Sequence, residues 1–158
     1  SVRNLRLDAQ GQVEAVIVEG RGTTKLPEFV YRIPWERIDQ SAVPNKVTAD
    51  IASGNLPEYG LFPGQRPLPD NPNTFNVTEV IGDFARLQAG QGYGYVSDVM
   101  FARDGRMQAV LVMRDSIAGG GTVAFGFPGT IGRWNPGASY YGLPYVTAEQ
   151  GYKARLSV

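Results

Sequence analysis

Apolar and polar positions alternate with a period of two in several stretches of the chain, a pattern typical of strands with one buried face. Residues 96–101 alternate in this way, and residues 107–113 form an apolar run rich in strand-forming side chains. The Asp104-Gly105 dipeptide between them is a strong signal of a hairpin turn. Helical periodicity is poor, apart from a turn expected at residues 34–38. The pattern therefore predicts an all-β fold of short strands, in the form of a small barrel or sandwich.

The sequence contains an internal repeat. When the chain is shifted by 94 positions, three stretches align without a gap, and the turn glycines and the prolines coincide. The matched stretches are residues 2–7 with 96–101, 11–18 with 105–112, and 29–34 with 123–128. Apolar positions match apolar positions although few residues are identical. We interpret the two stretches as two copies of one β-rich module.

The two copies are unequal, and the segment between them has a different composition. The first copy is expected at residues 1–40, a Pro/Gly-rich linker or wrap at 41–78, and the second copy with a C-terminal extension at 79–158. The first copy has no counterpart of the strand that precedes the second, so we expect it to be incomplete and to leave a sheet edge open. The C-terminal segment 140–156, a second copy of the chain, or residues upstream could cover that edge.

The amino-acid composition limits the kinds of catalytic and metal-binding site that the chain can form. The 158 residues include no Cys and no His, which excludes disulfides, thiolate nucleophiles, Ser-His-Asp triads and His-ligated metal sites. Fifteen Lys and Arg balance fifteen Asp and Glu, which argues against a nucleic-acid partner. No stretch approaches the roughly 18 apolar residues of a transmembrane helix. The sequence shows no signal peptide, and its lack of Cys fits a periplasmic or envelope location slightly better than the cytoplasm.

The second copy resembles a known family. The motif consists of Ile81-Gly82, Gly94-x-Val96-x-Asp98-Val99, Asp104-Gly105, an apolar run from Met107 to Val112, and a strand that ends at Pro128. This pattern is similar to that of the PRC-barrel, a domain of the photosynthetic reaction centre H subunit and of ribosome-maturation factors. In the first copy Asn4 replaces the motif aspartate, and Gln10 replaces the turn aspartate. The resemblance implies a small, partly open β-barrel that docks to a protein partner and carries no catalytic residue.

Five residues are candidates for partner binding: Asp98, Trp35, Trp134, Tyr140 and Tyr141. Asp98 is the family's recurrent acidic position, where it either contacts a partner or accepts hydrogen bonds from N–H groups of the Gly90–Gly94 turn. The aromatic residues form a recognition patch if they are exposed, because interface hot spots favour Trp and Tyr. If they are buried, they instead cap the barrel or cover the open edge.

Two further motifs are better explained by structure than by chemistry. The Gly90-x-Gly92-x-Gly94 stretch lacks the Lys-Ser/Thr ending of a phosphate-binding loop, so we expect a tight turn or bulge. Asp98 and Asp104 would lie about 20 Å apart if the chain between them is extended, too far for a pair of catalytic carboxylates. The sequence therefore predicts no enzyme, no cofactor and no metal site.

Three functions compete at this point. The first is a non-catalytic interaction or scaffolding protein that docks to a protein partner, or to another copy of itself, through barrel surfaces and sheet edges. The second is a protein that binds a small apolar ligand such as a lipid, quinone or pigment in a barrel mouth or between the modules. A carboxylate-based hydrolase ranks last, since no pair of acidic residues has the required spacing.

Overall fold

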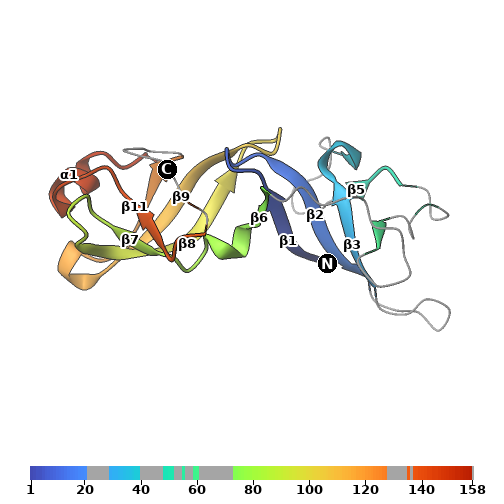
Figure 1. Cartoon of the computed structure of the whole chain (residues 1–158). Coiled ribbons are helices and arrows are strands. Elements are labelled where there is room, and N and C mark those ends of the chain that lie inside the picture. The colour runs from blue at the N-terminus through green and yellow to red at the C-terminus, as the bar shows by residue number, and fades with distance from the viewer. Residues whose placement is uncertain are drawn as a thin grey trace. The chain divides into compact units, whose positions relative to one another are not determined.

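The structure is a computed structural model that describes residues 1–20, 29–39, 48–51, 55, 59–60, 73–127, 135 and 137–157 (Figure 1). The described residues are mainly β, with three sheets and one short α-helix, and none of these sheets closes into a barrel. The chain divides into two compact units. The first comprises Ser1–Asp8 and Val13–Asn76, and the second comprises Ala9–Gln12 and Val77–Val158.

The first unit contains a four-stranded sheet in the order β3-β2-β1-β6 and a two-stranded sheet. The strands of the larger sheet are β1 (Val2–Leu7), β2 (Val13–Gly20), β3 (Phe29–Pro34) and β6 (Phe75–Asn76). A 3-10 turn, η1 (Trp35–Arg37), leads into the smaller sheet of β4 (Ile38–Asp39) and β5 (Thr48–Ala49). The expected turn at residues 34–38 is thus present as η1.

The core of the first unit draws on the segment expected to be a linker or wrap. Tyr59 is buried in the same cluster as Val16 and Ile33, and Phe75 is buried on β6, which pairs with β1. Burying side chains of this size stabilises a fold by about 1.5–3 kcal/mol each. The described parts of segment 41–78 therefore pack against the first unit up to Asn76.

The second unit is built on a five-stranded sheet in the order β10-β9-β8-β7-β11. Its strands are β7 (Phe84–Arg86), β8 (Gly92–Phe101), β9 (Met107–Arg114), β10 (Thr122–Gly126) and β11 (Tyr140–Gly142). Two 3-10 turns, η3 (Val77–Glu79) and η4 (Ser116–Ala118), and one helix, α1 (Ala148–Lys153), complete the described elements. Only the pair of β11 and β7, visible side by side in Figure 1, is parallel; the other neighbours are antiparallel.

The C-terminal segment covers both edges of this second sheet. β11 pairs with β7 at one edge, and Leu156 donates its backbone N–H to Ala124 of β10 at the other, with an N–O distance of 2.8 Å. Between these contacts lies α1, which begins with a reciprocal capping box between Thr147 and Gln150. The described pairings of the C-terminal segment thus lie within the second unit, and none of them is with the sheet edge of the first copy.

The first two strands of each copy have the same register at a spacing of 94 residues. Val2 pairs with Val18, and Val96 pairs with Val112; both ladders then shift at the same two places. The bounds of β2 and β9 also correspond residue for residue. The hairpin tip Ala9–Gln12 groups with the second unit, where the Gly11 carbonyl accepts the Met107 N–H.

The third strand corrects the ungapped alignment. Glu19 pairs with Val30, whereas Met113, 94 positions further along, pairs with Thr122 rather than with residue 124. Pro34 therefore corresponds in the ladder to Gly126 and not to Pro128. Equivalent paired positions are two residues further apart along the chain in the first copy, and an even shift keeps every side chain on its face of the sheet. The alternation of apolar and polar residues therefore cannot reveal this two-residue difference in register.

Candidate functional site

Four exposed apolar side chains lie next to one another across the second sheet. Cross-strand register pairs Tyr140 with Phe84, Phe84 with Tyr95, and Tyr95 with Met113. Directly paired residues project from the same face of a sheet. The exposed fractions are 44% for Tyr140, 65% for Phe84, 40% for Tyr95 and 38% for Met113. We call these four residues the outer row and their side of the sheet the outer face.

Strand alternation explains why the row is exposed. The neighbours of the row along three strands are fully buried. Ala85 follows Phe84 on β7, Val96 follows Tyr95 on β8, and Val112 precedes Met113 on β9. Because successive side chains in a strand point to opposite faces, the buried residues define an inner face and the outer row lies on its reverse. At the row, the sheet therefore contributes to the core with its inner side.

Two side-chain contacts hold the row in place. The Tyr95 hydroxyl donates a hydrogen bond to the Met113 sulfur at 3.1 Å. The Arg86 guanidinium lies 4.7 Å from the centre of the Tyr140 ring, a cation–π contact. These contacts restrict side chains that would otherwise move freely at the surface, and a restricted side chain loses less entropy when it binds.

Opposite charges flank the outer row. Arg86 follows Phe84 by two residues on β7 and lies on one side of the row, where it pairs with Gly92 and Gly142. Asp98 pairs with Leu111, two residues before Met113 on β9, and therefore lies on the other side. Both charged residues are exposed. The outer face thus carries a positive flank, an apolar row and a negative flank.

Asp98 also has a local structural role. Its Oδ1 accepts the backbone N–H of Val99 at 2.8 Å, where the ladder between β8 and β9 shifts register. The bond goes to the next residue of the strand and not to the Gly90–Gly94 turn expected from the sequence. Gly92 and Gly94 instead form part of β8, where the pairing with β7 shifts, so the glycine stretch provides a bulge rather than a phosphate loop.

The inner face is closed by aromatic residues and by α1. Tyr93 is fully buried and packs edge-on against Phe125, with ring centres 5.9 Å apart. Phe125 also contacts Tyr145 at 5.6 Å, and Gly151 of α1 lies against both tyrosines. This packing covers the inner face; on the outer face the row is exposed, whereas Ala109 and Ala124 are buried.

Two arginine side chains contact the Tyr152 ring at the C-terminal end of α1. The guanidinium groups of Arg155 and Arg114 lie 3.7 Å and 4.4 Å from the centre of the Tyr152 ring. Arg114 also donates to the Ala118 carbonyl at 2.8 Å, which ties β9 to η4. These contacts fasten the helix to the strand below it and are structural.

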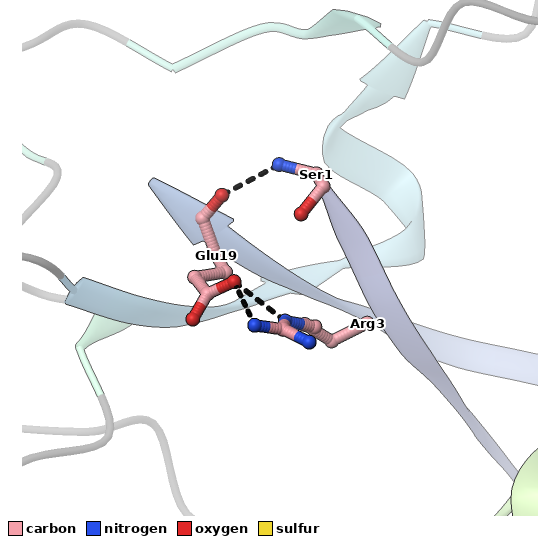
Figure 2. Close-up of polar contacts among 3 residues, drawn as sticks. All are labelled: Ser1, Arg3 and Glu19. Atoms are coloured by element: carbon pink, nitrogen blue, oxygen red, sulfur yellow. Dashed lines mark hydrogen bonds and ion pairs between the residues drawn. The ribbon is translucent and has the colours of Figure 1, made fainter. Parts of the chain in front are cut away.

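The first copy has polar residues at the positions of the outer row. At the 94-residue spacing, Glu19 corresponds to Met113 and Ser1 to Tyr95. Figure 2 shows that the Arg3 side chain forms an ion pair with Glu19, and Arg3 Nε lies 2.6 Å from the carboxylate. The backbones of Ser1 and Glu19 exchange hydrogen bonds of 2.6 and 2.7 Å, as expected for an antiparallel pair. The same strand framework thus accepts charged residues here, and only the second copy presents the apolar row.

The fold brings together two of the five candidates predicted from the sequence. Asp98 and Tyr140 lie on the outer face of the second unit, on and beside the row. Tyr141 lies on the inner face, where it is buried, its hydroxyl has no hydrogen-bond partner and burial raises its pKa. Trp35 is partly buried against the core of the first unit. Trp134 falls outside the described residues.

Sequence reasoning missed Phe84, Tyr95 and Met113. Each is an ordinary apolar residue of a strand, and none belongs to the family-like motif. Their alternation with buried neighbours was a visible signal, but it does not say which face of a sheet is covered. The register between β7, β8 and β9 is the information that joins them into one row.

Two other kinds of site are absent from the described residues. Among the residues that the structure describes, no group of three or more acidic side chains is placed to hold a metal ion. No helix within the described ranges is long and apolar enough to cross a membrane.

Two comparisons with known proteins gave no match. No model of a known protein family matches the chain, and no curated protein matches it. Any function must therefore be argued from the site itself.

Proposed function

We propose that this chain is a non-catalytic protein-interaction module that docks through the outer face of its second unit. The observation that supports the proposal is the outer row, in which four large apolar side chains stay exposed although they are adjacent on four neighbouring strands. Exposed apolar patches of this kind mark interaction sites on soluble proteins. Two of the four are tyrosines, which are enriched at the energetic centres of interfaces.

The proposal modifies the way in which docking was expected to occur. Edge pairing was the first expectation, but in the second unit β11 and the Ala124–Leu156 bridge occupy the outer edges of β7 and β10. An edge strand of three residues offers few free backbone groups to a partner. The sheet face offers side chains from four strands and is the better surface.

The resemblance to the PRC-barrel supports the same class of function. The motif residues lie on β8, β9 and the turn between them, and the family's members are docking modules. We propose membership of that family on these residues.

The test compares three baits made from the full chain: wild type, Met113→Glu and Ile117→Glu. Met113→Glu places in the row the residue that the first copy carries at this position, Glu19, so the strand is expected to tolerate it. Ile117 lies on η4 and not on the sheet, and it is fully exposed, which makes Ile117→Glu a control for replacing an exposed apolar residue with glutamate. Circular dichroism and thermal unfolding establish that all three baits fold.

Each bait is used for affinity capture from a native extract. Copies of the chain that come from the extract count among the proteins recovered. We expect a stoichiometric protein that is recovered with wild type and Ile117→Glu and is lost with Met113→Glu. Recovery of the same proteins with all three folded baits would overturn the proposal, and so would recovery of nothing beyond the bait from a chain that is also monomeric in solution.

A further inference from the structure

The outer face has a charge pattern that restricts what can occupy it. Arg86 lies on one side of the outer row and Asp98 on the other, and both are exposed. A uniformly acidic partner, such as an anionic lipid surface, would attract the Arg86 side and repel the Asp98 side. A uniformly basic partner would do the reverse. The occupant should therefore carry opposite charges on the two sides of an apolar strip.

A second copy of the chain carries that pattern. Consider a twofold axis that runs along the outer row, between two copies that face each other. The rotation keeps the apolar rows in contact and exchanges the two flanks, so Arg86 of each copy faces Asp98 of the other. The residues lie on adjacent strands, about 4.8 Å apart, an offset that a long arginine side chain can span.

We infer that the outer face is a self-pairing surface on which two copies of this chain form a face-to-face, twofold symmetric dimer. The inference rests on the proposed function, because it names the partner that the outer face recognises. Closed twofold dimers are the commonest oligomers of soluble proteins, and their interfaces are self-complementary in this way. The chain has a formal net charge of zero, so no long-range repulsion opposes the approach of two copies.

The size of the face sets the expected affinity. Five strands spaced about 4.8 Å apart make a face roughly 20 Å wide. Such a surface lies at the small end of specific interfaces, which is the range of weak and transient complexes. We therefore expect a dissociation constant in the micromolar range, so the protein has to be measured from low micromolar to several hundred micromolar concentration.

The experiment is sedimentation equilibrium of the full chain with paired charge reversals. Arg86→Glu places like charges at both flank contacts of the dimer, and so does Asp98→Lys. Each variant alone is expected to raise the dissociation constant at least tenfold. A one-to-one mixture of the two variants should recover the wild-type association, because each contact then joins one positive and one negative residue. Only pairing between two copies predicts this recovery.

Further variants distinguish the loss of a dimer contact from misfolding. Asp98→Lys loses the bond to Val99, whereas Asp98→Asn keeps an acceptor there, as Asn4 does in the first copy. Asp98→Asn is expected to weaken the dimer several-fold without a change in thermal stability. Met113→Glu should abolish association, and Ile117→Glu should leave it unchanged.

The outcomes separate this inference from the proposed function. A wild-type chain that is monomeric over the whole concentration range overturns self-pairing, and so does a dimer that Met113→Glu leaves intact or a mixture that shows no recovery. If the wild type is monomeric but Met113→Glu loses a different captured protein, the docking function stands and only the identity of the partner is wrong. If Met113→Glu changes neither association nor capture, both proposals fail.

Discussion

Asn4 and Asp98 occupy equivalent positions in the two copies, and each accepts a hydrogen bond from the backbone N–H of the residue that follows it. The Oδ1 atom of Asn4 lies 3.0 Å from Leu5 N, and that of Asp98 lies 2.8 Å from Val99 N. In both hairpins the ladder shifts register at this residue. The side chain thus satisfies a donor at the irregularity, and an amide oxygen serves as well as a carboxylate.

This equivalence predicts the effect of two substitutions at Asp98. Asp98→Asn should leave the free energy of unfolding within about 0.5 kcal/mol of wild type, because the acceptor is retained. Asp98→Ala removes the acceptor and should lower the free energy of unfolding by about 1 kcal/mol. Urea denaturation followed by circular dichroism measures both. Equal losses in the two variants would show that the charge, and not the acceptor, stabilises this strand.

Gly94 is required by the close approach of two strands. Its φ is 155°, and a Cβ there would overlap the carbonyl oxygen of Met113 and lie 2.8 Å from the Arg114 Cα. Gly94→Ala should therefore destabilise the second unit by more than about 3 kcal/mol, since neither strand can move without breaking the ladder. Gly126 lies on β10 with no atom within 4 Å of its added Cβ, so Gly126→Ala is the control. Thermal unfolding compares the two; similar midpoints would contradict this explanation.

Much of the strand layout could be predicted from the sequence because period-two alternation and the glycine turns are local signals. The run expected at residues 107–113 is part of β9, which extends one residue further, to Arg114. The register of β3 could not be predicted, since a shift of two residues leaves the alternation unchanged. The helix α1 has only six residues, too few for a helical period, and its one sequence signal is the Thr147–Gln150 capping box.

The candidate site could be predicted only in part for a different reason. Tyr140 and Tyr141 are neighbours with the same chemistry, yet one is exposed and the other is buried. Which of them faces outward depends on the pairing of β11 with β7, two segments separated by more than 50 residues of chain. Long-range pairing also decides that Asp98 lies beside the row. No local pattern contains this information.

The capping box should decide whether α1 forms. The Thr147 hydroxyl accepts the Gln150 N–H at 3.2 Å, and the Gln150 side chain accepts the Thr147 N–H at 3.4 Å. Thr147→Ala should lower the free energy of unfolding of the second unit by about 1 kcal/mol. Glu149→Ala removes only an exposed ion pair with Lys153 and should cost less than about 0.5 kcal/mol. Urea unfolding measures both, and equal losses would argue against the cap.

Asp83 should make the stability of the second unit depend on pH. Its Oδ2 is buried and has no hydrogen-bond partner, and burial raises the pKa of this carboxyl from 3.8 to about 6. The folded state therefore holds the proton more tightly than the unfolded state does. The stability gained from this protonation is fully present below pH 3.8 and is lost as the pH rises through about 6.

Asp83→Asn removes the titrating group and should remove this dependence. The melting temperatures of variant and wild type should be closest near pH 4, and the variant should become relatively more stable as the pH rises to about 7. Asp104→Asn changes an exposed carboxylate in the hairpin turn and serves as the control for replacing a carboxylate with an amide. Differential scanning calorimetry across this pH range measures all three proteins. A difference between Asp83→Asn and wild type that does not change with pH would mean that Asp83 is ionised in the folded protein throughout.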